Sequence, residues 1–419
     1  NQVANLGAKQ LTLAGAGTGQ TIISAAFLND SVLRGSGIGS NVGGLVIRDM
    51  TIADGRTPGV GVGAGYPVDG AGLVLANSTV LVERVRFENN HANDDGGGMY
   101  TGSSVVTIID CEFEGNTADG SAGAYLANLG TLSMDGAQFT DNHALDANAD
   151  PDAGWGGALY LISQSSSFVI THSTFESNTG TRGGAVYTAS TTGTFAFCTF
   201  DDNEATEGFG GAFYSRISGT LAINDSTLRR NHAESSGGVI YADDITLFVR
   251  RSTLVANTTV SGGGALRCLG TGSLDVERCG FYGNTTAENG GAINTSQATN
   301  IRNCLFVGNT AGSGGALNMT VGPSSVNFCT FVGNDANAQP IARTNASGIT
   351  MRNCLATQNT PIDDIVGGAG WTIQYSNIER SNPGNTVPGA GNINEAPIFV
   401  ALPSAGGDTM WGTMDDDFG

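Results

Sequence analysis

The chain has 419 residues, including 64 glycines and only 10 prolines, and 38 acidic side chains stand against 18 basic ones. So little proline excludes collagen and a proline-rich disordered tract, and the net charge of −20 argues against a nucleic-acid partner. No apolar run reaches membrane-spanning length. No signal peptide starts at Asn1, so we expect that a leader was removed or that the chain is part of a longer one.

The first predicted elements are two strands around a glycine-rich turn, in LTLAGAGTGQTII at 11–23. A glycine-rich insertion, ADGRTPGVGVGAGYPVDG, follows at 53–70. We expect this insertion to leave the regular structure at a corner and to form one rim of a shallow binding surface. Tyr66 would be an aromatic member of that surface.

A Phe-x-x-Asn word then recurs along most of the chain, mostly at spacings of 25 to 28 residues. Its aromatic position is predicted to be buried, because it lies two residues after a small side chain on the same strand face. Its fourth position is asparagine in every copy: Asn90, Asn116, Asn142, Asn178, Asn203, Asn231, Asn257, Asn284, Asn309, Asn334 and Asn359. We call these the ladder asparagines and expect their amides to bond to neighbouring copies.

The small position before the aromatic one is cysteine in four successive copies, Cys279, Cys304, Cys329 and Cys354. We expect these cysteines to be buried, reduced and structural, because stacked parallel strands hold Cβ atoms farther apart than a disulfide prefers. A glycine pair followed by an apolar residue, such as Gly290-Gly291-Ala292, comes after most ladder asparagines. Glycine there permits a positive φ and close backbone approach.

A repeat of this length, with several short strands and no helical pattern, predicts an all-β fold: a right-handed parallel β-helix of about 25–27 residues per coil. Each coil then buries its apolar face only by stacking on the next. We expect one continuous solenoid domain, with N-terminal coils at 1–45, regular coils at 46–360 and a closing coil and tail at 361–419.

The repeated FxxN and GGA[ILV] words resemble the repeats of chlamydial polymorphic outer-membrane proteins and related bacterial surface β-helix proteins, over roughly 45–360. The stretch YSNIER…GNINEAPIFV at 375–400 is similar to the closing coil of large secreted bacterial β-helix proteins. This resemblance implies an extracellular or cell-surface location, in several cases with an adhesive role.

Acidic residues recur between the ladder asparagines and the glycine pairs, for example Asp94, Asp95, Asp119 and Glu288. Stacked coils would align them as a negative stripe, which is either a solvated face or a cation-binding edge.

The longest coil carries the insertion LDANADPDAGW, in which Asp146, Asn148, Asp150 and Asp152 alternate. Oxygen ligands at every second position can wrap a Ca²⁺ ion. Pro151 stands where an EF-hand loop has glycine, and the alternative is a plain acidic loop. Trp155, just beyond, is either an exposed platform for stacking on a sugar or a side chain packed on the loop.

These features favour a secreted or cell-surface structural or adhesive protein, whose partner is itself, as an oligomer or fibre, or a surface polysaccharide or protein. The alternative is a β-helix that binds or degrades polysaccharides as a lyase or hydrolase. A hydrolase needs two carboxyl groups at a defined separation. The adjacent pairs, such as Asp201-Asp202, point to opposite faces of a strand, so no catalytic residue is predicted.

Overall fold

A computed structural model describes residues 11–26, 30–38, 44–58, 69–147, 153–162, 167–344, 346–362, 366–367, 370–382, 386–399, 403–413 and 416–417. These residues form strands and turns, and none of them lies in a helix. The described residues accordingly include no helix of the length and apolarity needed to cross a bilayer. The predicted all-β class is confirmed.

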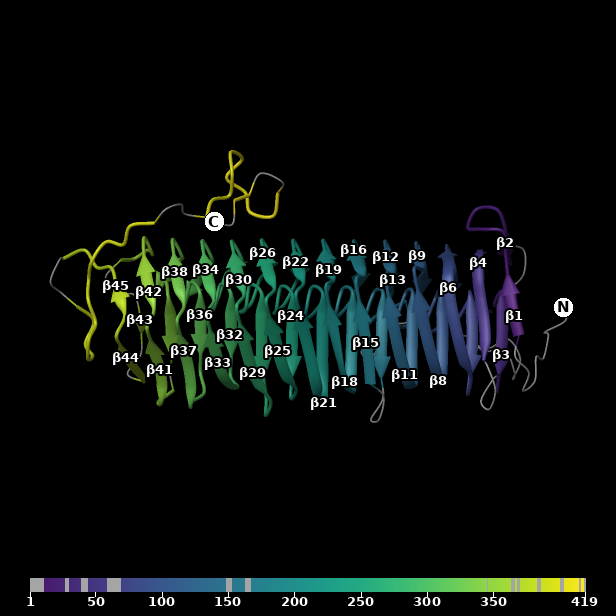
Figure 1. The fold of residues 1–419 in the computed structure, drawn as a ribbon, viewed down its shortest axis with the longest axis horizontal. Coiled ribbons are helices and arrows are strands. Elements are labelled where there is room, and N and C mark those ends of the chain that lie inside the picture. Colours follow the sequence, from purple (N-terminus) through teal and green to yellow (C-terminus); the bar gives the residue numbers. More distant parts are fainter. Residues whose placement is uncertain are drawn as a thin grey trace. The chain divides into compact units, whose positions relative to one another are not determined.

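Each coil contains up to four short strands, and every strand pairs in parallel with its equivalent in the neighbouring coil (Figure 1). The first strand follows the glycine pair in the coils that have one, and its copies are β3 (Leu33–Ser36), β5 (Leu73–Ala76), β14 (Leu159–Ile162), β24 (Ile240–Asp243), β28 (Leu266–Leu269), β32 (Ile293–Thr295), β36 (Leu317–Met319), β40 (Ala342–Thr344) and β43 (Val366–Gly367).

The second strand ends just before the small residue: β1 (Leu11–Ala14), β15 (Ser167–Thr171), β25 (Thr246–Arg250), β29 (Ser273–Glu277), β33 (Ala298–Arg302), β37 (Ser324–Asn327), β41 (Ile349–Arg352) and β44 (Trp371–Gln374). In four coils the first and second strands are continuous: β8 (Met99–Ile109), β11 (Tyr125–Asp135), β18 (Val186–Ala196) and β21 (Phe213–Asn224).

The third strand carries the buried aromatic position: β2 (Ile22–Ser24), β9 (Glu112–Glu114), β12 (Gln138–Thr140), β16 (Thr174–Glu176), β19 (Thr199–Asp201), β22 (Thr227–Arg229), β26 (Thr253–Val255), β30 (Gly280–Tyr282), β34 (Leu305–Val307), β38 (Thr330–Val332), β42 (Leu355–Thr357) and β45 (Asn377–Ile378). In β4 (Leu45–Ala53) and β6 (Thr79–Glu88) it is continuous with the second strand.

The fourth strand follows the ladder asparagine: β7 (His91–Ala92), β10 (Thr117–Ala118), β13 (His143–Ala144), β17 (Thr179–Gly180), β20 (Glu204–Ala205), β23 (His232–Ala233), β27 (Thr258–Thr259), β31 (Thr285–Thr286), β35 (Thr310–Ser313) and β39 (Asp335–Ala338).

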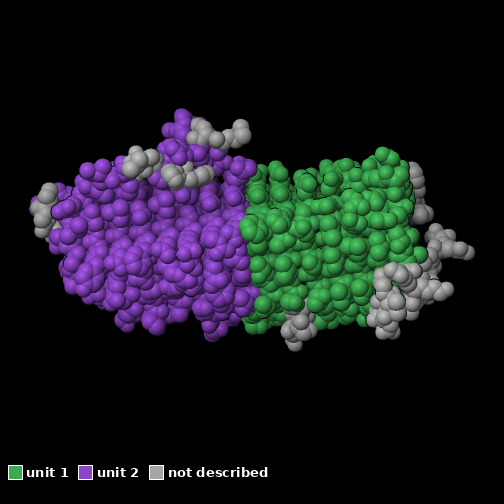
Figure 2. Space-filling model, in the orientation of Figure 1, with its two compact units in different colours: residues 1–207, 212–219 green, residues 208–211, 220–419 purple. Residues whose placement is uncertain are grey.

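The chain divides into two compact units, shown in Figure 2. Unit 1 comprises residues 1–207 and 212–219, and unit 2 comprises residues 208–211 and 220–419. The prediction of one continuous domain with boundaries near 45 and 360 stays a prediction.

Columns of identical side chains fill the interior of each unit. Phe87, Phe113 and Phe139 in unit 1 are fully buried, and their successive rings stack with centroids 4.7 Å apart. In unit 2, Phe281, Phe306 and Phe331 stack at 4.9 Å. This spacing matches the distance between adjacent strands, so each ring lies on its counterpart in the next coil.

The ladder asparagines lie at the corner between the third and fourth strands and are buried. In unit 2, Asn284 Nδ2 donates to Asn309 Oδ1 at 2.9 Å, and Asn309 Nδ2 donates to Asn334 Oδ1 at 2.9 Å. Asn284 Nδ2 also donates to the Leu254 carbonyl, in the preceding coil, at 3.0 Å. Each amide therefore bonds to the coils on both sides and satisfies backbone groups where the chain turns.

The seven cysteines are all buried and none forms a disulfide. In the predicted column, the Cys304 thiol donates to the Arg302 carbonyl at 3.2 Å, and Cys279 does the same with Glu277 at 3.3 Å. Burial raises the pKa of the Cys111 thiol to about 12. Such thiols behave as small apolar side chains, as expected from the sequence.

Candidate functional site

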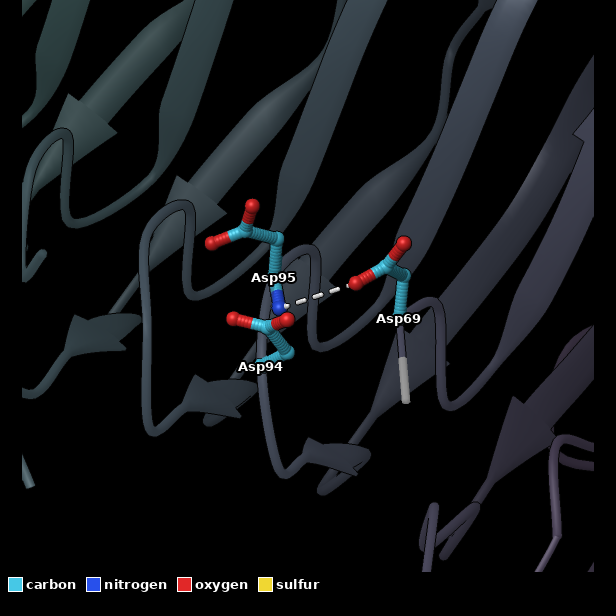
Figure 3. A group of neighbouring side chains, drawn as sticks. All are labelled: Asp69, Asp94 and Asp95. Atoms are coloured by element: carbon cyan, nitrogen blue, oxygen red, sulfur yellow. Dashed lines mark hydrogen bonds between the residues drawn. The ribbon is translucent and has the colours of Figure 1, made fainter. Parts of the chain in front are cut away.

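Three carboxyl groups converge on one edge of unit 1, in the turns that lead into two successive first strands (Figure 3). Asp69 lies just before β5, while Asp94 and Asp95 lie between β7 and β8. One oxygen from each carboxyl group lies within 4.8 Å of the others. We call these three residues the acid group.

Parallel register holds the acid group together. The Asp95 amide donates to Asp69 Oδ1 at 3.5 Å, and the Ser121 amide donates to Asp95 Oδ1 at 2.6 Å. The Asp95 carbonyl accepts from the Gly70 amide at 2.9 Å, so the two turns are bonded to each other through the backbone. Because the same corner recurs in each coil, acidic residues at that corner are stacked by the fold.

The electrostatics of the acid group favour protons or cations. Asp69 and Asp95 are half-buried and Asp94 is exposed. Burial, with the charge of Asp94 adding to it, raises the pKa of Asp69 to about 6. Burial also raises the pKa of Asp95 to about 7, where the Asp94 and Asp69 charges act in the same direction and the Ser121 amide opposes them. Near neutral pH the group can therefore share protons, and its oxygens are of the type that hard cations such as Ca²⁺ prefer.

We expect the stability of the protein in chelator to fall as pH rises from 5 to 8, because Asp95 binds a proton more tightly when folded. A carboxyl group whose pKa is raised by folding stabilises the fold fully below its unfolded pKa, near 3.8, and that contribution is lost as pH rises through about 7. One pKa unit corresponds to about 1.4 kcal/mol, so the free energy of unfolding can fall by at most about 3 kcal/mol between pH 5 and the folded pKa of about 7. Partial exposure reduces the expected loss to about 1–2 kcal/mol.

Asp95→Asn should flatten this dependence in denaturant unfolding measured at pH 5 and pH 8. Asp225→Asn is the matched control, because the Arg251 hydrogen bond lowers the pKa of Asp225 and its titration falls at acid pH. Equal pH slopes in wild type and Asp95→Asn would contradict the prediction.

Asp94 and Asp95 belong to the acidic stripe predicted from the sequence, whereas Asp69 was not predicted as part of it. The signal was available, because Asp69-Gly70 and Asp95-Gly96 occupy equivalent places before their first strands. The long glycine-rich insertion at 53–70, which ends in Asp69-Gly70, hid this equivalence.

The predicted calcium loop lies largely outside the described residues. Asp146 is described and half-buried, whereas Asn148, Asp150 and Asp152 are not among the described residues. The Ala147 amide beside Asp146 donates to the Asp119 carbonyl of the neighbouring coil at 3.2 Å. The calcium site therefore stays a prediction, and so does the role of Tyr66, which also lies outside the described residues.

Trp155 is packed rather than exposed, with 5% of its surface accessible. Its ring centroid lies 4.7 Å from that of Tyr187 and 6.2 Å from that of Tyr214. The guanidinium groups of Arg182 and Arg216 lie 5.5 and 5.9 Å from the Trp155 ring. The exposed alternative for this side chain is wrong, because Trp155 packs against tyrosines of later coils, and any role in binding a ligand stays a prediction.

Unit 2 has an open groove of about 460 Å³ over its second strands. Equivalent outward positions of successive coils line it: Phe248, Asp275, Asn300, Ser325 and Thr350. Their polar groups bond along the column, since Asn300 Nδ2 donates to Asp275 Oδ2 at 3.1 Å and the Ser325 hydroxyl donates to Asn300 Oδ1 at 2.7 Å. Arg302 Nη1 also donates to Asp275 Oδ2, at 3.0 Å.

The groove combines the Phe248 side chain, whose ring has the Arg250 guanidinium 4.5 Å from its centroid, with amide and hydroxyl groups, and these polar groups suit a polar polymer such as a glycan. Asp275 is held by Arg302 and Asn300.

Comparison with known proteins agrees with this architecture. Residues 36–220 match the family described as "Right handed beta helix region". A search of curated proteins found no match to the sequence. The chain is a right-handed parallel β-helix repeat protein in its fold.

Proposed function

We propose that this chain is a secreted or cell-surface structural or adhesive protein that mediates self-assembly or contact with a surface. The observation that carries the proposal is the repetition of outward-facing side chains in register. On the third strands of unit 1 the outward position is Glu88, Glu114, Thr140, Glu176 and Asp201 in successive coils.

This position carries an acidic side chain in four of the five coils, of which Asp201 is buried, and adjacent coils lie about 4.8 Å apart. Such a surface suits an extended partner, such as a polymer or another copy of the chain, better than a single small substrate. Short turns between the coils agree with this, because deep enzyme pockets need long loops to enclose a substrate. The strongly acidic balance suits an exported protein whose calcium loop at 146–152 fills outside the cell.

The groove of unit 2 favours a second candidate, a polysaccharide-binding or polysaccharide-degrading β-helix. Asn300 and Ser325 supply groups that recognise hydroxyls, and the Phe248 ring, with the Arg250 guanidinium 4.5 Å from its centroid, lines the same groove. Degradation would further require an acid and a base at the bound bond. Asp275 lies in the groove, so the experiment tests whether its carboxyl group has a catalytic role.

The experiment compares self-association, measured by sedimentation velocity, with retention on immobilised pectin and alginate, with and without 1 mM Ca²⁺ as an approximate extracellular level. We expect self-association or retention without release of reducing or unsaturated ends. Asn300→Ala combined with Ser325→Ala should remove retention if the groove binds the polymer. Product release that Asp275→Asn abolishes would replace the adhesive proposal by the enzyme alternative, and neither association nor retention would reject both.

A further inference from the structure

The outward position of the third strands changes character within unit 2. There it is Val255, Tyr282, Val307 and Val332, paired in register across four coils. We call these four residues the stripe. The equivalent position of unit 1 is mostly acidic. A column that faces outward would normally be polar, so an apolar stripe needs a partner.

That partner is a later segment of the same chain. Phe399 and Trp411 pack against the stripe, which leaves its side chains only 2–6% exposed. The Trp411 ring lies 5.3 Å from the Tyr282 ring, and Arg230 Nη1 donates to the Gly412 carbonyl at 2.8 Å. Figure 1 shows this segment, in yellow, beside the third strands β26, β30 and β34. We call residues 396–417, as far as they are described, the strap.

Two glycines make room for the tryptophan. A Cβ atom at Gly283 would lie 2.3 Å from Trp411 Cδ1, and one at Gly308 would lie 3.1 Å from Trp411 Nε1. The same position, just before the ladder asparagine, is also glycine at Gly115 and Gly333 and holds Asn89, Asp141 and Ser177 in other coils. At Gly283 and Gly308 the absence of a side chain leaves the space that the Trp411 ring fills.

Residues 403–417 of the strap, as far as they are described, are folded locally, and the described residues between the last coil and this part are irregular and partly exposed. The Ser404 and Asp417 backbones exchange hydrogen bonds of 2.8 and 2.9 Å, and the Gly412 amide donates to Asp416 Oδ2 at 2.7 Å. Residues 394–399 have no regular structure, and Ile398 is 100% exposed. A compact element on an exposed connection can dock on its own molecule or on a neighbour with the same contacts.

We propose that the stripe is a self-association surface and that its partner is the strap of a second copy of this chain. This inference rests on the proposed role in self-assembly and identifies the surface that performs it. When two copies exchange an identical element, each contact within one molecule is replaced by the same contact between two molecules. The main free-energy cost of the exchange is therefore the entropy of bringing two molecules together. The strap closes on its own molecule when the protein is dilute and docks on a neighbour when it is concentrated.

A pair of full-length variants tests the exchange. Trp411→Ala disables the strap and leaves the stripe intact, while Tyr282→Glu with Val307→Glu disables the stripe and leaves the strap intact. Glutamate is compatible with the fold at this position, because Glu88 and Glu114 occupy it in unit 1. Far-UV circular dichroism and thermal melting establish that each variant is folded.

In sedimentation velocity, wild type should form dimers or larger species as its concentration rises. Each variant alone should associate at least about tenfold more weakly. Their mixture should regain a heterodimer, because the intact strap of one docks on the intact stripe of the other. The matched control is the triple variant Tyr282→Glu, Val307→Glu, Trp411→Ala, which should form no complex with Trp411→Ala.

A labelled synthetic peptide of the whole strap, residues 396–417, should also bind the Trp411→Ala chain and not the triple variant. Absence of peptide binding, or of the heterodimer at concentrations where wild type associates, overturns the exchange. If wild type and both variants associate equally, self-assembly stands and the strap is not its agent. If wild type stays monomeric and the mixture forms no complex, both the exchange and self-assembly are rejected.

Discussion

Replacing Asn284 by alanine is expected to destabilise unit 2 by about 3–5 kcal/mol. The substitution removes four buried hydrogen bonds. The backbone amide and the side-chain Nδ2 of Asn257 lose Asn284 Oδ1 as their acceptor, in bonds of 3.1 and 2.9 Å. The Leu254 carbonyl and Asn309 Oδ1 lose Asn284 Nδ2 as their donor, in bonds of 3.0 and 2.9 Å. Each buried polar group left unpaired costs about 1–3 kcal/mol, and partial entry of water reduces the sum.

Asn284→Asp distinguishes the loss of hydrogen bonds in the ladder from the loss of side-chain volume, because aspartate keeps the shape of the side chain. Its second oxygen would face the Leu254 carbonyl and Asn309 Oδ1, both acceptors, so we expect aspartate to be at least as destabilising as alanine at neutral pH. Asn327→Ala, on the partly exposed side of β37, is the control and should change stability by less than about 0.5 kcal/mol. Guanidinium unfolding followed by circular dichroism measures all three, and wild-type stability in Asn284→Ala would show that the ladder contributes nothing.

The coil and its interior could be predicted from sequence because they are repeated. A residue type that recurs every 25 residues, such as Cys279 and Cys304, has the same environment in each copy, so one assignment serves all of them. The chain turns a corner just before each of these cysteines, where Arg278 and Asn303 have φ of 54°. Sequence alone did not mark these positions, because neither is glycine, the residue expected at positive φ.

The candidate sites were harder to predict because they depend on elements that are not repeated. Asp69, in the acid group, lies at the end of a glycine-rich insertion, and Trp155 is buried by tyrosines of later coils. The strap is the clearest case, since Arg230 and Gly412 are 182 residues apart. Val307 and Val332 are apolar at outward-facing positions, which indicates that something covers them. The periodic pattern does not indicate which segment of the chain does so.

Gly291→Ala is expected to destabilise unit 2 by about 4 kcal/mol or more, or to prevent its folding. A Cβ atom at Gly291 would lie 2.0 Å from the Gly315 carbonyl oxygen and 2.8 Å from both the amide nitrogen and the carbonyl oxygen of Thr310. These are backbone atoms of the next coil, held by the parallel ladder, so they cannot move aside as a flexible side chain can. The same position in the preceding coil, Gly264, would place a Cβ atom 2.0 Å from the Gly291 carbonyl oxygen.

Gly333→Ala is the matched control, because it separates crowding between coils from backbone strain. Gly333 has φ of 59°, yet a Cβ atom there would meet nothing within 4 Å. We therefore expect it to cost only the left-handed conformation of an alanine, about 1 kcal/mol. Guanidinium unfolding of the two variants gives the comparison. Equal losses of stability in the two variants would mean that the second glycine of each pair is needed only for its backbone conformation. A much larger loss of stability in Gly291→Ala would show that this glycine determines how closely the coils stack.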